Sequence, residues 1–221
     1  MCFVACRARR PAWTPAALGL VALLAGCSAP PLRDGAGIHP PPNLVQTPDA
    51  VPRIEPLRVG GPNKPYTVLG QTYVPMTADL PLRETGGASW YGIKFQGRPT
   101  ASGEPYDMYA MTAAHRTMPI PSYARVRNPA NGREVIVRIN DRGPFAPGRV
   151  IDLSYVAALK LGVLRGVAPV EVQRLTFADI RAMQALQALQ ARREEPPPAR
   201  VSPAAPAPSS LDVWLAAHGP P

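Results

Sequence analysis

Outside its first 27 residues the chain contains no cysteine, and this excludes two kinds of chemistry from the rest of it. The three cysteines are Cys2, Cys6 and Cys27. The part of the chain after residue 27 can therefore form no disulfide and offers no thiol nucleophile. Any domain folded there must be held together by packing alone.

Histidines and long apolar runs are also scarce. The three histidines, His39, His115 and His218, lie too far apart for the usual spacing of zinc ligands. We therefore expect no metal and no cofactor. The apolar run at residues 16–24 is far shorter than the roughly 20 residues that a membrane-spanning helix requires. This run is not expected to be a transmembrane helix.

The N-terminal residues have the pattern of a lipoprotein signal. Three arginines precede the apolar run, and the run ends in Leu-Ala-Gly immediately before Cys27. This lipobox predicts a signal peptide over residues 1–26, which is removed, and a lipid on Cys27 that anchors the mature protein. Ser28 follows the cysteine, which resembles signals sorted to the outer membrane of Gram-negative bacteria. An ordinary secretory signal with an incidental cysteine is the alternative interpretation.

Positive charge exceeds negative charge throughout the chain, which has 24 lysines and arginines, 15 acidic residues and a formal net charge of +9. Removal of residues 1–26 takes away three arginines and no acid, which lowers the charge by three to +6. A basic envelope protein suits an anionic partner such as peptidoglycan or lipid head groups, although the charge also serves solubility. The arginines are scattered, so we do not expect nucleic acid as a partner.

Proline-rich segments flank a single region of β-strand patterning. Residues 27–64 predict an extended tether, whose reach at about 3.1 Å per residue is at most roughly 115 Å. Residues 65–85 predict an arm with a short hairpin that packs on the domain. Residues 86–177, roughly 90 in number, suffice for one modest core. A narrow amphipathic helix is expected over 178–195, followed by a Pro/Ala-rich tail over 196–221 that is a candidate contact for a division protein.

The central region predicts an all-β domain. Val135, Val137 and Ile139 alternate with Ile136 and Arg138, as in a strand of a closed sheet. Short runs of this kind, separated by turn residues, indicate a small closed β-barrel. The expected strands are Ala88–Gly92, Tyr109–Ala113, Ala124–Asn128, Glu134–Asn140 and Val170–Phe177. One short helix is expected from Asp152, as its cap, to Gly162, which ends it.

Polar residues beside glycine, proline or aromatic residues recur in a fixed series of turns, which suggests a site. The series closely resembles the rare lipoprotein A family, over about residues 86–172. The blocks that carry the resemblance are Ala88-Ser-Trp-Tyr-Gly92, Thr100-Ala-Ser-Gly-Glu-Pro-Tyr-Asp107, Ala113-Ala-His115, Asn140-Asp-Arg-Gly-Pro-Phe145 and Ile151-Asp-Leu-Ser154.

The resemblance implies a six-stranded double-psi β-barrel with one short helix and the activity of a septal-ring lytic transglycosylase. Such an enzyme cuts peptidoglycan glycan strands, in this family those freed of peptides, and leaves 1,6-anhydro-muramyl ends during division or daughter-cell separation. Many family members end in a domain that binds glycan, and this chain has too few ordered residues after the barrel to form one. Septal recruitment by that route is therefore not expected.

The resemblance places Glu104, His115 and Asp141 on the functional positions of the family. Cleavage of a glycosidic bond requires a carboxylic acid that protonates the leaving oxygen and a group that handles the positive charge at the sugar. We expect Asp141 to be the general acid/base, because apolar neighbours raise a carboxyl pKa. Glu104 is expected to be the second carboxylate, and His115 to orient one of them or to donate to the sugar.

Each of these residues also has an ordinary structural interpretation. Asp141 is equally suited to accept backbone N–H bonds in a turn, Glu104 to be a solvated loop acid, and His115 to be a core histidine with satisfied hydrogen bonds. For Asp152 we favour a structural role as the cap of the predicted helix. The alternative is that Asp152 serves as a catalytic acid.

Further residues are candidates for contact with the glycan. Trp90 and Tyr91 are suited to stack on sugar rings, but alternation allows only one of the two to face the groove while the other packs in the barrel. Hydrogen bonds to neighbours compete with glycan contacts for the polar candidates. The predicted substrate-binding residues are Trp90, Tyr91, Ser102, Asn140, Arg142 and Asp152.

Two functions of other classes remain open from the sequence. One is an expansin-like lipoprotein that binds peptidoglycan without cleaving it. The other is a division-site scaffold that works through the C-terminal tail. The retained Glu104, His115 and Asp141 favour the enzyme.

Overall fold

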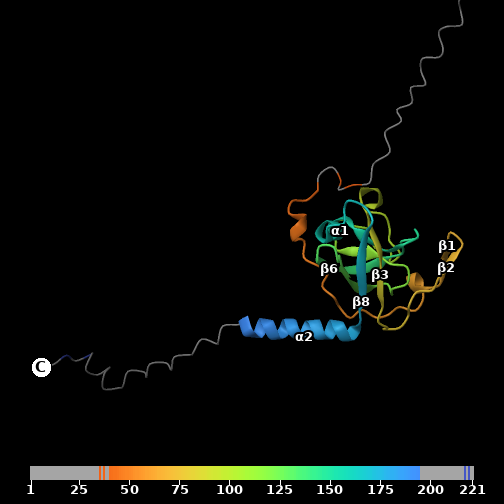
Figure 1. Cartoon of the computed structure of the whole chain (residues 1–221). Helices are drawn as coiled ribbons and strands as arrows, with labels where there is room; N and C mark the ends of the chain where they lie inside the picture. Colours follow the sequence, from red (N-terminus) through yellow and green to blue (C-terminus); the bar gives the residue numbers. More distant parts are fainter. Residues whose placement is uncertain (1–34, 36, 38–39, 195–216, 218, 220–221) are drawn as a thin grey trace, which may run out of the picture.

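The computed structural model describes residues 35, 37, 40–194, 217 and 219 (Figure 1). The predicted signal peptide, Cys27 and most of the predicted tail lie outside the described residues. The elements are η1 (Leu44–Gln46), η2 (Gly61–Asn63), β1 (Tyr66–Val68), β2 (Gln71–Tyr73), β3 (Arg83–Tyr91), η3 (Ile93–Phe95), β4 (Thr112–Ala114), β5 (Ser122–Arg127), β6 (Glu134–Asp141), β7 (Arg149–Ser154), α1 (Tyr155–Leu161), β8 (Ala168–Leu175) and α2 (Phe177–Glu194).

Six strands close into a mixed barrel in the order β3-β7-β4-β6-β5-β8. The pairs β3·β7 and β4·β6 are parallel, and the other four pairs are antiparallel. Closure leaves no free sheet edge around the ring. The expectation of an all-β, six-stranded double-psi barrel with a short helix is confirmed.

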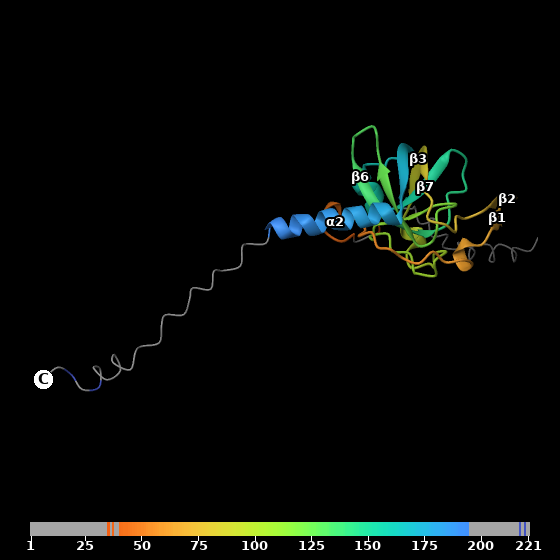
Figure 2. The ribbon, with the colours of Figure 1, turned by 90° about the horizontal axis from the view of Figure 1, so that it is seen from below.

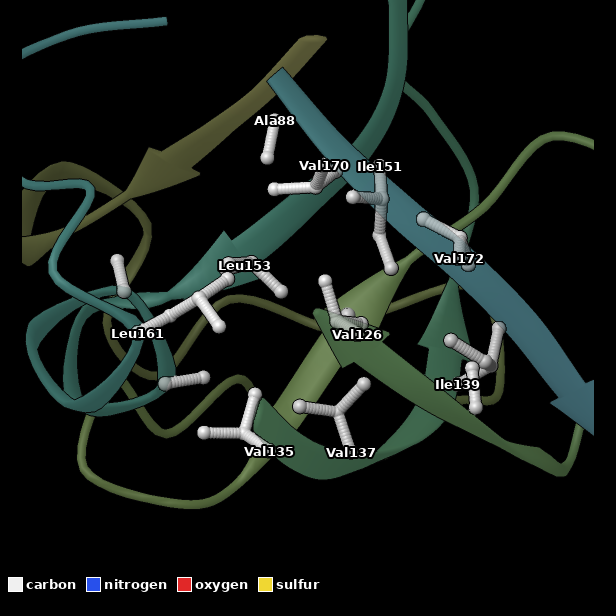
Figure 3. Packing of buried hydrophobic residues seen from close by; sticks show 14 of the residues in the cluster. Ala88, Val126, Val135, Val137, Ile139, Ile151, Leu153, Leu161, Val170 and Val172 are labelled. Atoms are coloured by element: carbon white, nitrogen blue, oxygen red, sulfur yellow. The ribbon is translucent and has the colours of Figure 1, made fainter. Parts of the chain in front are cut away.

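The core fills the inside of this ring, and it follows the alternation of the sequence. Val135, Val137 and Ile139 are fully buried, whereas Ile136 and Arg138 between them are half-buried. Figure 3 shows the side chains of Val135, Val137 and Ile139 directed toward those of the other strands across the barrel. All six strands of the barrel contribute apolar side chains to one cluster, and this packing holds them together.

β5 and β8 begin and end a few residues earlier than expected, and larger differences occur at β7, β3 and β4. β7 is an additional strand, in which Ile151 and Leu153 are buried in the core, whereas the sequence placed this block in a turn and a helix start. β3 begins at Arg83, inside the predicted arm. β4 covers only Thr112–Ala114, because the residues before it form turns.

The helix α1 begins later than predicted, and the prediction that Asp152 caps it is wrong. Asp152 lies within β7, and the cap is Ser154, whose side chain accepts a hydrogen bond from the backbone N–H of Ala157 at 3.3 Å. The predicted end is confirmed, since Gly162 has φ +78° and donates its N–H to the last carbonyls of the helix. The side chain of Asp152 therefore does not cap the helix and is available for other contacts.

The segment before the barrel packs on it from residue 44 to residue 64, which differs from the predicted extended tether. The reason lies in the shortness of β4, which leaves Ile136 in β6 without a strand partner on that side. Ala50 donates to the Ile136 carbonyl at 3.1 Å, and Asp49 accepts the Ile136 N–H at 3.0 Å. Asn63 is 3% exposed. Its side-chain amide donates to the carbonyl of Ile120 and accepts the N–H of Ile120. A proline-rich strip thus satisfies backbone groups that would otherwise be buried unpaired.

The helix predicted after the barrel is present as α2 and leaves the barrel as a single rod (Figures 1 and 2). Ile180 is buried against Tyr123 and Leu175, while Leu186 and Leu189 further along are mostly exposed. Only the first turns of α2 are therefore docked. Among the described residues, no helix combines the length and the apolarity that crossing a membrane requires.

Two glycines in β3 allow close approach of the neighbouring strands. A Cβ on Gly86 would lie 2.5 Å from Cγ1 of Val150, and one on Gly87 would lie 2.6 Å from Cγ1 of Val167. We predict that Gly86→Ala lowers the free energy of unfolding by about 1 to 3 kcal/mol, as expected for overpacking. The measurement is urea denaturation.

Val150→Ala provides the control, because it removes the methyl group that the new Cβ meets. In the Val150→Ala background, Gly86→Ala is expected to cost much less than it does alone. An equal cost in both backgrounds would show that the effect does not arise from this contact.

Candidate active site

An open groove on the outside of the barrel is lined by four of the predicted site residues, Tyr91, Asp141, Arg142 and Asp152. Its volume is about 470 Å³. It lies over the ends of β4, β6 and β7, and the chain after β6 and the tip of the β1–β2 hairpin form one side of it. Its lining consists of Leu69, Tyr91, Phe95, Ala114, Asp141, Arg142, Gly143, Phe145, Ala146, Pro147, Arg149 and Asp152.

Strand register places two carboxylates on either side of one small residue. Ala114 in β4 pairs with Asp141 of β6 on one side and with Asp152 of β7 on the other. Side chains of partnered residues point to the same face of a sheet. Neighbouring strands are about 4.8 Å apart, so the backbones of Asp141 and Asp152, one on each side of β4, are separated by roughly 10 Å. The methyl group of Ala114 forms the floor between the carboxylates.

A β-bulge determines that Asp141 faces the groove. Ile139 pairs with Ala113, and both are in the core, but the next pair is Ala114 with Asp141, so Asn140 is an extra residue in β6. Strict alternation after Ile139 would direct Asp141 into the core. The bulge places Asp141 on the outer face beside Ala114 instead, which is a recognised use of bulges near functional sites.

The carboxylate of Asp141 is held at one oxygen and open at the other. Its Oδ1 accepts the backbone N–H groups of Ala101 and Arg142, both at 2.8 Å. Its Oδ2 has no hydrogen-bond partner among the described residues. Burial raises the pKa of Asp141 and outweighs these two bonds, which lower it, and the charge of Asp152 raises the pKa further. Asp141 therefore has the environment of a proton donor.

Asp152 is the second carboxylate in the groove. Its Oδ1 accepts a hydrogen bond from the hydroxyl of Ser89, its partner in β3, and lies 3.7 Å from Nη1 of Arg149. Burial raises its pKa, although Ser89 and Arg149 act in the opposite direction. Asp152 thus faces Asp141 across Ala114 and is fixed by two side chains.

Glu104 lies in the turn beside the groove and has a different environment. Both its oxygens accept from Nη1 of Arg138, at 2.7 and 2.9 Å, and Oε2 also accepts from Asn140 at 3.3 Å. Partial burial raises its pKa, but the hydrogen bonds of Arg138 and Asn140 prevail and hold the pKa below the usual range. Glu104 does not line the groove, so the structure does not place it with Asp141 and Asp152.

The turn that carries Glu104 is attached to the end of β6. The N–H of Ala101 bonds Asp141, and the N–H of Ser102 bonds the carbonyl of Asn140 at 3.0 Å. Ser102 Oγ lies 2.9 Å from the hydroxyl of Thr100, and Asn140 is 4% exposed with its amide donating to Glu104. Ser102 and Asn140 therefore shape this turn, and the binding role predicted for them stays a prediction.

His115 is fully buried at the end of β4. Its Nδ1 accepts the N–H groups of Thr117 and Met118, at 3.1 and 3.0 Å, and its Nε2 lies 3.5 Å from Oε2 of Glu84. The proximity of the His115 ring holds the pKa of Glu84 below its usual range, although the two atoms are not within hydrogen-bond geometry. The ring is thus directed to Glu84, and only the backbone N–H of His115 contacts Asp141, at its carbonyl.

Arg142 is occupied by the protein. Its guanidinium donates to the carbonyls of Pro62, His115 and Met118 and to Oδ1 of Asn63. Burial lowers its pKa to about 10. Arg142 therefore ties the segment before the barrel to the end of β4, and few of its donors remain for a ligand.

Trp90 and Tyr91 point to opposite faces, as strand alternation requires. Trp90 packs edge-on against Tyr155 and donates Nε1–H to the carbonyl of Leu164 at 3.2 Å. Tyr91 lines the groove, with its ring stacked on Tyr106 at 4.1 Å between centroids. Of the two aromatic residues predicted to meet the glycan, only Tyr91 is at the groove.

Three residues that fix or separate the two carboxylates were not among the predicted site residues. They are Ser89, Ala114 and Arg149. Ser89 is two residues before Tyr91 in the same strand, so both side chains lie on the same face. This spacing could have predicted that Ser89 lies near the groove. Ala114 and Arg149 have no such signal, because their importance depends on pairing between distant strands. Among the described residues, no group of three His, Cys, Asp or Glu side chains is arranged to hold a metal ion.

Comparison with known proteins gives consistent matches. Residues 83–172 match the family described as lytic transglycolase. The chain is 48% identical over 162 residues to the endolytic peptidoglycan transglycosylase RlpA of Vibrio cholerae, covering 71% of this chain and 61% of that protein. The chain is 53% identical over 155 residues to RlpA of Pseudomonas aeruginosa strain UCBPP-PA14, which covers 67% of this chain and 45% of that protein. The chain thus spans about half of the length of these relatives.

Among solved structures, the Streptomyces papain inhibitor matches 42% of this chain and 94% of its own, with 27% identity and a TM-score of 0.35. The sequence relatives and the matched domain agree with each other and with the closed six-stranded barrel. The barrel of this chain, residues 83–172, thus belongs to the domain family described as lytic transglycolase, and the chain is similar to the RlpA proteins that carry such a domain.

Proposed function

We propose that this protein is a lytic transglycosylase that cleaves peptidoglycan glycan strands, those free of peptides in particular, and leaves 1,6-anhydro-muramyl ends. The observation that carries the proposal is the carboxyl group of Asp141, whose pKa burial raises and whose Oδ2 is open in a groove. A protonated carboxyl at an accessible site is what the leaving oxygen of a glycoside needs.

In the proposed reaction, Asp141 both gives and takes back one proton. It protonates the glycosidic oxygen that links the muramoyl anomeric carbon to the next sugar, and that C–O bond breaks with its electron pair going to the oxygen. The 6-hydroxyl of the same muramoyl residue then attacks the anomeric carbon, and its proton returns to Asp141. No water is consumed, so one group serves as acid and then as base.

The positive charge at the anomeric carbon requires a second carboxylate. We assign this role to Asp152, because it lines the groove and shares Ala114 as a neighbour with Asp141. Glu104, for which the sequence predicts that role, is paired with Arg138 and holds the turn whose Ala101 N–H binds Asp141. Glu104 and His115 are accordingly proposed as positioning residues for Asp141.

We also propose that the mature protein is anchored to the outer membrane by a lipid on Cys27 and acts in division or daughter-cell separation. The support is the lipobox and Ser28 in the sequence, together with the envelope substrate that transglycosylase relatives imply. Because residues 44–64 pack on the barrel, the part of the chain that spans from anchor to domain is shorter than the full predicted tether.

The first prediction concerns the reaction. The chain from Ser28 onward is incubated with peptide-free glycan strands and the products are identified by mass spectrometry. We expect 1,6-anhydro-muramyl ends, and a loss of about 10²-fold or more in rate for Asp141→Asn, as general acid–base catalysis commonly supplies that factor. Asp107→Asn is the matched control, because Asp107 lies in an exposed turn outside the groove and accepts hydrogen bonds from the backbone N–H of Tyr109 and the side-chain amide of Gln96, which asparagine can also accept.

Other outcomes of this experiment have distinct meanings. Reducing ends in place of anhydro ends would indicate a hydrolase. Binding of glycan without any product would contradict the enzymatic proposal and support an expansin-like binder.

The second prediction concerns stability. Because the pKa of Asp141 is raised in the folded chain, the folded state binds its proton more tightly than the unfolded state does. Stability is therefore lost as pH rises from the unfolded pKa, about 3.9, through the raised folded value. We expect Asp141→Asn to have a higher Tm than the parent at pH 7 and an equal Tm near pH 4, with Asp107→Asn unchanged throughout. A lower Tm for Asp141→Asn at pH 7 would refute the burial argument.

The third prediction separates positioning from contact for Glu104. If Glu104→Gln loosens the turn and weakens the Ala101 bond to Asp141, the pKa of Asp141 rises, since that bond lowers it. The basic limb of the pH–rate profile then moves to higher pH, with a fall in kcat of roughly 10-fold. A fall in kcat without movement of that limb would show instead that Glu104 acts directly on the sugar. Asp152→Asn is measured alongside, with the larger loss expected there.

A further inference from the structure

The tip of the β1–β2 hairpin has a residue that the backbone does not favour. The turn between Tyr66–Val68 and Gln71–Tyr73 consists of Leu69 and Gly70, with φ of +51° and +77°. Turns with two left-handed residues favour Asn-Gly, because a branched side chain is strained at positive φ. Leu69 is 90% exposed, so burial does not compensate for this strain. Neither local conformation nor packing explains a leucine here.

The hairpin is held against the active-site groove by aromatic contacts. The rings of Tyr66 and Tyr73 stack on each other at 5.4 Å between centroids, and both contact Phe145, at 6.2 and 5.6 Å. The hydroxyl of Tyr66 donates to the carbonyl of Arg116 at 2.9 Å. Figure 1 shows the hairpin at the side of the barrel. Its position is thereby fixed relative to Phe145, which also lines the groove of the carboxylates.

A second hollow continues the groove along the hairpin. It has a volume of about 390 Å³ and is lined by both hairpin strands, Arg116 and the chain after β6. It shares Leu69, Phe145, Ala146 and Pro147 with the groove that holds Asp141 and Asp152. The two hollows therefore adjoin at Leu69 and the chain after β6.

We propose that Leu69 is a substrate-binding residue, and that the β1–β2 hairpin forms the wall of a subsite for sugar units beyond the bond that is cleaved. This inference rests on the proposed function, because it takes a glycan strand as the occupant. A polymer that lies over Asp141 must continue out of the groove, and the second hollow offers a continuation of comparable volume. The exposed side chain of Leu69 presents methyl groups to the apolar face of a sugar ring or to its N-acetyl methyl group.

The strain at Leu69 agrees with a functional role. A residue kept in a sparsely populated conformation without a packing benefit is typical of ligand contacts. Gln71 and Arg116, which line the far hollow, supply polar groups for sugar hydroxyls. The hairpin, which the sequence predicts only to pack on the domain, thus becomes part of the binding surface.

The test replaces Leu69 by the residue that its backbone favours. Leu69→Asn is expected to raise the Tm, because asparagine tolerates the left-handed conformation, and to lower cleavage of long peptide-free glycan strands by roughly 10-fold through KM. These opposite signs distinguish substrate contact from a structural role, for which activity would follow stability. Leu69→Met, which keeps an apolar side chain, is expected to retain most of the rate. Leu80→Asn is the matched control, since Leu80 is 57% exposed and lines neither hollow.

A binding measurement separates this inference from the proposed function. Asp141→Asn and the double variant Asp141→Asn/Leu69→Asn are titrated with the same peptide-free glycan strands, and about 10-fold weaker binding is expected for the double variant. If the parent chain releases no product while this difference holds, the proposed function fails and the subsite stands. If the parent cleaves glycan and Leu69→Asn changes neither binding nor rate, the subsite is refuted and the proposed function stands.

Discussion

The pairing of β4 with β6 is the constraint on which the site depends. These strands are parallel, and one extra residue, Asn140, shifts their register between Ala113 and Ala114. That shift places Asp141 on the outer face of the barrel, beside Ala114 and across from Asp152. The shortness of β4 also exposes backbone groups of Ile136, which the segment at Asp49 and Ala50 then covers. One three-residue strand thus determines both the face that carries the two carboxylates and the place where the N-terminal segment packs.

Charged side chains connect that segment to the site. Arg138 of β6 binds Glu55 in the segment before the barrel and Glu104 in the turn that supplies an N–H to Asp141. Arg142 performs a similar function on the other side, since it ties Asn63 and Pro62 to the end of β4. A region whose composition indicates an extended tether therefore supports the candidate active site through residues 55–63.

The chain departs from what stability alone favours at a few positions, and these lie together. Burial raises the pKa of Asp141 and of Asp152, so their ionisation at neutral pH opposes folding. Leu69 occupies a backbone conformation that suits glycine or asparagine. All three residues line the same groove. Such local conflicts are expected at functional sites, where binding and proton transfer are selected in addition to the fold.

The barrel class, the alternation of Val135, Val137 and Ile139, the end of α1 at Gly162 and the presence of α2 could all be predicted from the sequence, because they depend on local periodicity and turn residues. The motif around Asp141 also marked that residue as a candidate. The position of Asp152 in a strand, the hydrogen bonds that occupy Arg142 and the pairing of Glu104 with Arg138 became visible only in the folded structure. These outcomes depend on register and pairing between segments far apart in the chain, and no local pattern encodes a one-residue shift between two strands.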